Sequence, residues 1–150
     1  MAYGDTATRQ KESWSPGDIK SYTLAASQAV VKGDIIVVKP DGYAYKAYAA
    51  AGGATLDVFV GIAMENITTI AAEVTTLLKV RTEGEAEFII AGSSIADVGN
   101  IAYHESGATG NAQTVTVTAP AHPIRIGHIS ESISATLCRV KFRGSTWDAA

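Results

Sequence analysis

The chain has a single cysteine, and charged and aromatic residues are scarce, at 18% and 7% of its 150 residues. One cysteine cannot form an intramolecular disulfide. Cys138 stands in an apolar run, so we expect a small buried side chain rather than a reactive thiol. The net charge is −3 and Lys and Arg do not cluster, so the electrostatic footprint of a nucleic-acid-binding protein is missing.

Long apolar runs are also missing. No stretch reaches the ~18 uncharged apolar residues that suggest a membrane-spanning helix, and the N-terminus lacks the apolar core of a signal peptide. We therefore expect no membrane partner, and a product made and kept in the cytoplasm or in something assembled there.

Patterns that carry chemistry are absent as well. The three histidines, His104, His122 and His128, have no second ligand at zinc spacing, and no nucleophile motif surrounds any serine. We predict no catalytic residue, no metal and no cofactor, hence no enzyme. Glu65 and Glu131 have two interpretations: a symmetric pair of acids, or a solvated residue beside each strand end. The second is favoured, because each glutamate follows a glycine where the chain leaves a strand.

What the chain does contain is short β-strand patterns. Between residues 19 and 142, short runs rich in Val, Ile, Thr, Tyr and Phe alternate with turn residues. Pro40-Asp41-Gly42 predicts one hairpin, and Glu83-Gly84-Glu85 predicts a second that would pair Val80 with Phe88. Apolar residues make up 47%, and the length suits one domain. These features predict an all-β fold, a compact barrel or sandwich.

The second half of the chain resembles the first. Tyr22–Ser27 matches Phe88–Ser93 at an offset of 66, and Gly33 matches Gly99 in the same register. The match resumes at an offset of 60, where Thr76–Arg81 falls on Thr136–Lys141. Duplication and chance similarity of short strands both remain open. Duplication is favoured, because the register is kept over a long stretch, and it predicts two similar halves, at about 22–81 and 88–141.

The two ends differ from this β-domain of residues 19–142. Residues 1–18 are polar and aperiodic but carry Tyr3 and Trp14, and the tail of residues 143–150 carries Trp147. The N-terminal segment is either a disordered tail or an extended arm that becomes ordered against a partner, anchored by its aromatic residues. Tyr3, Trp14 and Trp147 are thus the candidate partner-binding residues.

The strand patterns also predict the core. Large apolar side chains at inward positions of both halves should be largely buried: Leu24, Ile35, Val37, Val60, Leu78, Val80, Phe88, Ile90, Ile101, Ile126, Cys138 and Val140.

Several segments together resemble the head-decoration, or capsid cement, proteins of tailed bacteriophages. The resemblance lies in Val31–Val37, the Asp41-Gly42 hairpin, Phe59–Ala63, the Gly-Glu turn and Ser94–Tyr103, and it extends over roughly residues 19–142. The second half departs from the pattern, with Gly-Asn at residues 99–100 in place of Gly-Asp, which a turn tolerates.

The resemblance implies a non-enzymatic structural protein that binds the outside of a bacteriophage capsid at subunit junctions. It further implies the major capsid protein as partner, a homo-oligomer with a trimer favoured, and location in the virion. Two other classes stay open. One is a tail, fibre or baseplate accessory module. The other is a small hydrolase or carbohydrate-binding β-domain, for which the only aromatic candidates are Tyr43, Tyr45, Tyr48 and Tyr103.

Overall fold

The computed structural model describes residues 19–47, 57–72, 75–105, 113–119 and 123–144. In these residues the regular structure is β-strand, apart from one 3₁₀ turn, η2 (Ile95–Asp97). The all-β prediction is confirmed. The predicted N-terminal arm lies outside the described residues.

The first half forms a five-stranded sheet that curls back on itself, and we term it the first barrel. A parallel bridge between Leu24 and Ala44 joins its two ends, and Ala25 N–H donates to Ala44 O at 2.9 Å. A two-stranded sheet of β3 (Ala29–Val30) and β7 (Ile67–Thr68) accompanies it. The five strands follow the order β2 (Ile19–Thr23), β8 (Leu77–Arg81), β6 (Val58–Ala63), β4 (Ile35–Val38) and β5 (Ala44–Lys46).

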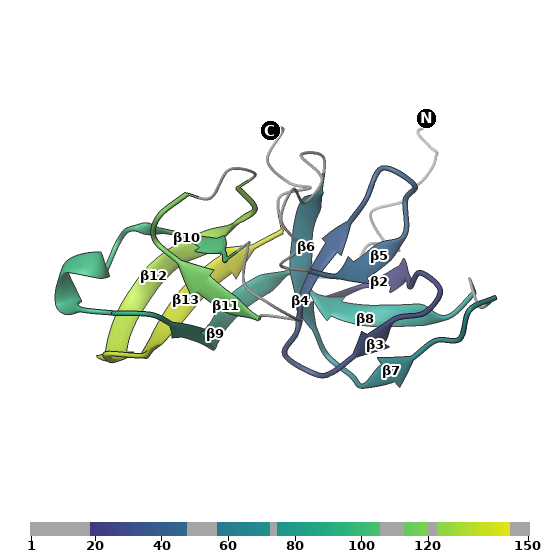
Figure 1. Ribbon diagram of the computed structural model, residues 1–150, viewed down its shortest axis with the longest axis horizontal. Helices are drawn as coiled ribbons and strands as arrows, with labels where there is room; N and C mark the ends of the chain where they lie inside the picture. The colour runs from purple at the N-terminus through teal and green to yellow at the C-terminus, as the bar shows by residue number, and fades with distance from the viewer. Residues whose placement is uncertain (1–18, 48–56, 73–74, 106–112, 120–122, 145–150) are drawn as a thin grey trace, which may run out of the picture.

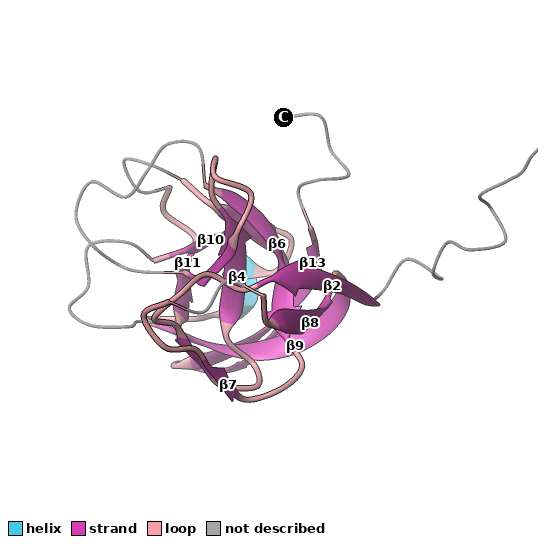
Figure 2. Cartoon of the chain, turned by 90° about the vertical axis from the view of Figure 1, so that its right-hand side faces the viewer, coloured by secondary structure: helices cyan, strands magenta, loops and turns pink. Residues whose placement is uncertain are grey.

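The second half is a closed five-stranded barrel with the same order of equivalent strands. Antiparallel pairing of Ile101–Tyr103 with Arg125–His128 closes the barrel. Figure 1 shows the two barrels side by side along the long axis, and Figure 2 looks along that axis with the first barrel in front. The order is β10 (Ile101–His104), β11 (Thr114–Thr116), β9 (Glu83–Ile90), β13 (Leu137–Arg143) and β12 (Arg125–Ser134).

Strand register repeats at the two offsets found in the sequence. Tyr22 pairs with Leu78 in the first barrel, and Phe88 pairs with Cys138 in the second. Both barrels carry a β-bulge at the same place, after Ile36 in β4 and after Ala102 in β10. The similarity of the two halves therefore extends to the irregular features of the strands.

Equivalent glycines make equivalent turns. Gly33 has a φ of 98° and donates its N–H to Ala63 O at 2.9 Å, while Gly99 has a φ of 93° and donates to Ile129 O at 2.8 Å. A positive φ of this size strains residues that carry a Cβ, so each turn depends on glycine.

The predicted core is buried with one exception. All the side chains expected inside are below a tenth exposed, except Ile101, which is half-buried. Ile101 points out of the second barrel, at the position that Ile35 occupies in the first. Ile35 is buried there because the second barrel covers it, whereas no described element covers Ile101 in the same way.

One apolar cluster joins the barrels. It contains Ile35, Val37, Phe59 and Ile62 from the outer face of β4 and β6, together with the interior of the second barrel. A second cluster, which includes Leu24, fills the first barrel. Because β4 and β6 are buried on both faces, the first barrel closes one end of the second, and the two pack as a single body.

The hairpin predicted at Glu83-Gly84-Glu85 is wrong. Val80 pairs with Lys20 and Ala63, while Phe88 pairs with Cys138. The chain runs on through this segment in extended form, so that β8 belongs to the first barrel and β9 to the second. The hairpin at Pro40–Gly42 is confirmed, with Gly42 N–H donating to Lys39 O at 2.8 Å.

Candidate functional site

Tyr3, Trp14 and Trp147, the predicted partner-binding residues, lie outside the described residues. The structure does place the points where their segments join the body. Ile19, at the start of β2, pairs with Arg81, and Gly144, after β13, donates its N–H to Thr82 O at 2.8 Å. The two terminal segments therefore begin beside consecutive residues, Arg81 and Thr82, near the junction of the barrels. The proximity of the two attachment points could not be predicted from strand patterns, because it depends on which strands are neighbours in the sheets.

Large exposed apolar side chains form a second feature of the surface. In the first barrel, Leu77 is 58% exposed and Ile70 is 70% exposed. In the second, Ile89 is 60% exposed and Ile95, on η2, is 84% exposed. Leu77 begins β8 and Ile89 precedes the end of β9, so both lie at the strand ends far from the junction. Sequence reasoning did not single out these residues, because an inward and an outward isoleucine look alike in an apolar run.

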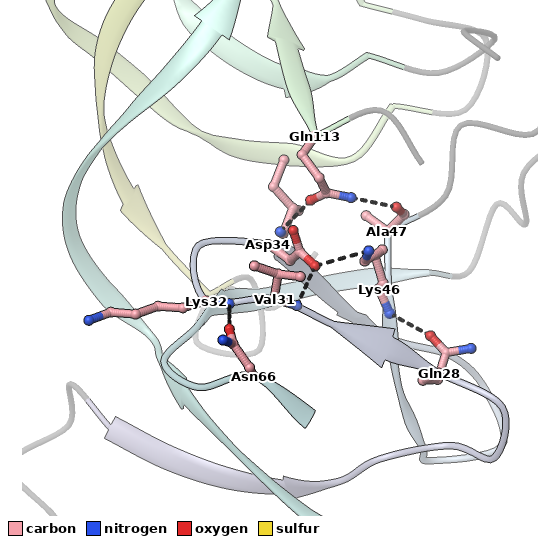
Figure 3. Close-up of polar contacts among 9 residues, drawn as sticks. Gln28, Val31, Lys32, Asp34, Lys46, Ala47, Asn66 and Gln113 are labelled. Atoms are coloured by element: carbon pink, nitrogen blue, oxygen red, sulfur yellow. Dashed lines mark hydrogen bonds and ion pairs between the residues drawn. The ribbon is translucent and has the colours of Figure 1, made fainter. Parts of the chain in front are cut away.

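A polar cluster lies between the barrels, close to the covered face (Figure 3). Asp34 forms an ion pair with Lys46, with 3.1 Å between Asp34 Oδ2 and Lys46 Nζ, and their side chains are 11% and 14% exposed. The same carboxylate oxygen accepts the N–H of Val31 at 2.8 Å, which closes the turn before β4. Gln113 accepts the N–H of Ile35 and donates to Ala47 O at 3.0 Å.

Gln113 precedes β11 and so belongs to the second barrel, whereas Ile35 and Ala47 belong to the first. Its amide therefore bonds backbone groups across the junction. Each polar group in this cluster is satisfied by a neighbour, as partly buried groups require. The cluster fixes how the barrels meet.

Side-chain bonds also hold the β3–β7 sheet in place. Thr69, 4% exposed, donates its hydroxyl to Ala25 O at 2.8 Å and accepts the N–H of Gln28 at 2.9 Å. Asn66 accepts the N–H of Lys32 at 2.7 Å. These contacts make the sheet a fixed part of the first barrel.

The β4–β5 hairpin carries a group of charged residues. Tyr45 donates its hydroxyl to Asp41 Oδ2 at 2.6 Å. This bond is the main cause that lowers the pKa of Asp41, and with burial it raises the pKa of Tyr45 to about 12. Lys39 lies 3.7 Å from Asp57 and 4.9 Å from the Tyr45 ring centre. Burial raises the pKa of Asp57, whose side chain is 9% exposed and whose Oδ1 has no hydrogen-bond partner among the described residues.

The remaining candidates separate into distinct environments. Glu65 accepts the N–H of Lys79 at 2.9 Å, and Glu131 pairs with Arg139, so the equivalent acids lie on different barrels and do not form a joint acid pair. Burial raises the pKa of Cys138, which is fully enclosed in the second barrel, as predicted. His104 is buried and His128 is exposed, while His122 lies outside the described residues.

The aromatic candidates for a carbohydrate site are dispersed. Tyr45 packs against the junction cluster and Tyr103 lies on β10 of the other barrel, while Tyr48 falls outside the described residues. Within the described ranges, no group of three or more His, Cys, Asp or Glu side chains is arranged to hold a metal ion. No helix of the described part is long and apolar enough to cross a bilayer.

The chain matches no protein-family model, and a search of curated proteins finds no significant match.

Proposed function

We propose that this chain is a non-enzymatic structural protein that binds the outside of a bacteriophage capsid at subunit junctions and stabilises the shell. In this proposal the major capsid protein is its partner, and the chain acts in the virion as a homo-oligomer, with a trimer favoured. Trp14, Tyr3 and Trp147 anchor it. The sequence resemblance to capsid cement proteins gives the proposal its direction.

The observation that carries the proposal is the common origin of the two terminal segments. Because Ile19 adjoins Arg81 and Gly144 adjoins the next residue, Thr82, the two segments that carry the aromatic residues are attached to the body close together. Two anchors on one rigid body act on one surface with a high effective concentration, which strengthens binding beyond that of either anchor alone. The joined apolar cluster holds the two barrels together as that body. A protein that binds only the assembled shell stabilises that state by mass action.

The test is sedimentation of the purified chain with heads produced by a phage that lacks the gene for this chain. The proposal predicts saturable binding at a fixed ratio to the capsid subunit and a higher melting temperature of the decorated heads. Unexpanded proheads serve as the comparison, because subunit junctions change on expansion. Absence of binding to expanded heads at any concentration would exclude this function.

A further inference from the structure

The Asp41–Gly42 peptide has a sequence that favours a spontaneous change of the main chain. It is the single Asp-Gly pair of the chain, and no Asn-Gly pair occurs. In such a pair the glycine nitrogen attacks Cγ of the protonated aspartic acid, which closes a succinimide ring and expels water. Water then opens the ring, and cleavage at the original main-chain carbonyl leaves isoaspartate, whose main chain is longer by one methylene. Glycine favours the attack because no side chain hinders its nitrogen.

Neither burial nor steric hindrance blocks this reaction. Asp41 and Gly42 are both exposed at the tip of the β4–β5 hairpin, so water reaches the ring. Gly42 has a φ of 87°, and nothing lies within 4 Å of the position that a Cβ would take there. Protection of this peptide must therefore come from hydrogen bonds to the reacting groups.

The attacking nitrogen is held by the turn. Gly42 N–H donates to Lys39 O at 2.8 Å, and pairing of Val38 with Ala44 fixes the strands on either side. Ring closure removes the proton from this nitrogen, so the bond to Lys39 has to break before isoaspartate can form.

The carboxyl group is held at both oxygens. Asp41 Oδ1 accepts the N–H of Tyr43 at 2.9 Å, and Oδ2 accepts the hydroxyl of Tyr45 at 2.6 Å. Both bonds favour the ionised form, and the bond from Tyr45 is the main cause that lowers the pKa of Asp41. The ionised form is unreactive, because ring closure needs the neutral acid, which can lose water.

The two bonds to the carboxyl differ in origin. The N–H of Tyr43 belongs to the turn itself, two residues from Asp41. The Tyr45 ring packs against the apolar cluster that joins the barrels, and Lys39 Nζ lies 4.9 Å from the ring centre. Its hydroxyl is therefore positioned by the folded barrels, so this part of the protection exists only in the native protein.

Isomerisation at the tip would affect the barrel junction. The strand that follows the turn carries Lys46, which pairs with Asp34 at 3.1 Å, and leads to Ala47, whose carbonyl accepts from Gln113 at 3.0 Å. An added methylene in the turn would shift β5 against β4, and with it both contacts. Damage at an exposed turn would thus loosen the polar cluster between the barrels.

We propose that Asp41–Gly42 is a site of spontaneous isomerisation that the Tyr45 hydroxyl protects in the folded protein. This protection needs no binding partner, so it is tested on the purified chain alone. The measurement is peptide mapping after long incubation at neutral pH in heavy-oxygen water. Opening of the ring adds one heavy oxygen atom, which marks every Asp41 that has passed through the succinimide.

Tyr45→Phe keeps the packed ring and loses only the hydroxyl. Labelling at Asp41 should become faster by about fivefold or more, because a hydrogen bond to an ionised group is among the stronger ones. Tyr43→Phe is the matched control: it also removes a hydroxyl from this hairpin, but it keeps the backbone N–H that bonds Asp41. Its labelling should equal that of the wild type.

The unfolded wild-type chain in guanidinium chloride gives the rate without protection, and the native chain should be slower by about tenfold or more. Tyr45→Met, which also lacks the hydroxyl, is a second variant, and circular dichroism checks that each variant is folded. Equal labelling of native and unfolded chains would overturn the proposal. Folded Tyr45 variants that are labelled no faster than Tyr43→Phe would also overturn it.

Discussion

The rings of Phe59 and Phe142 meet edge to face at the junction, with their centres 6.2 Å apart and their planes at 83°. Phe59 lies on β6 of the first barrel and Phe142 near the end of β13 of the second, and both are buried. This contact belongs to the apolar cluster that crosses the junction, so the stability of each barrel depends on the other.

Phe142→Ala should therefore destabilise the whole protein. Truncating a fully buried phenylalanine costs about 3–5 kcal/mol. Because the lost contacts reach both barrels, differential scanning calorimetry should record one transition at a lower temperature. Phe88→Ala, inside the second barrel, is the comparison for ordinary core truncation. Two separate transitions in the wild-type protein would show that the barrels unfold independently.

Gly61 and Gly127 should be equally intolerant of substitution. They occupy equivalent positions, and a Cβ at either would collide with a backbone carbonyl of the neighbouring strand, that of Arg81 or that of Lys141. Overpacking of this kind costs roughly 1–3 kcal/mol or more. Gly92→Ala is the control, because Gly92 shares the positive φ of Gly61 but nothing lies near its Cβ position. In urea denaturation, both Gly61→Ala and Gly127→Ala should have a much lower free energy of unfolding than Gly92→Ala.

The equivalence of these two glycines shows how much of the fold can be predicted from the sequence. The offsets of 66 and 60 relate strands that hold the same place in the strand orders of the two halves, because turn glycines and inward apolar positions repeat in register. They could not predict the neighbours of each strand, which are set by contacts distant in the chain. Glu83-Gly84-Glu85 has the residues of a turn, yet each half closes on itself and the segment runs between the barrels.

The surface was less predictable than the core. The aromatic residues of the ends were identified, but the proximity of Ile19 and Gly144 comes from the pairing of β2 with β8 and from the bond to Thr82. Ile89 belongs to an apolar run, and its outward direction follows only from its pairing with Leu137 and Thr114.

Asp57→Asn should stabilise the protein at neutral pH. Burial raises the pKa of Asp57 in the folded state, so folded protein binds this proton more tightly than unfolded protein does. The stability linked to this group is complete below the unfolded pKa and is lost as the pH rises through the folded pKa. At a pH above the folded pKa of Asp57, the variant should therefore melt at a higher temperature than the wild type. In acid the two melting temperatures should converge.

Asp41→Asn gives the opposite sign and serves as the control. The bond from Tyr45 lowers the pKa of Asp41, so its ionised form is favoured by folding, and its contribution is present above the unfolded pKa and lost in acid. We expect Asp41→Asn to be less stable than the wild type at neutral pH and equally stable in acid. If Asp57→Asn also lost stability at neutral pH, the ion pair with Lys39 would outweigh the cost of burial.

Deletion of residues 1–14 should separate folding from binding. The described β-structure starts at Ile19, so the melting temperature should change little. The deletion removes Tyr3 and Trp14, and retention on phage heads should fall by roughly tenfold or more, because a few aromatic anchors provide most of the energy of an interface. Trp147→Ala tests the other anchor. Decoration at the wild-type concentration by the truncated chain would assign binding to the barrels instead.

Electron cryo-microscopy of phage heads carrying the chain tests the central proposal most directly. The account predicts two-barrel bodies on the outer surface at the junctions between capsid subunits, with the side that holds Ile19 and Gly144 turned toward the shell. Heads without such density, or bodies whose junction side faces away from the capsid, would contradict it.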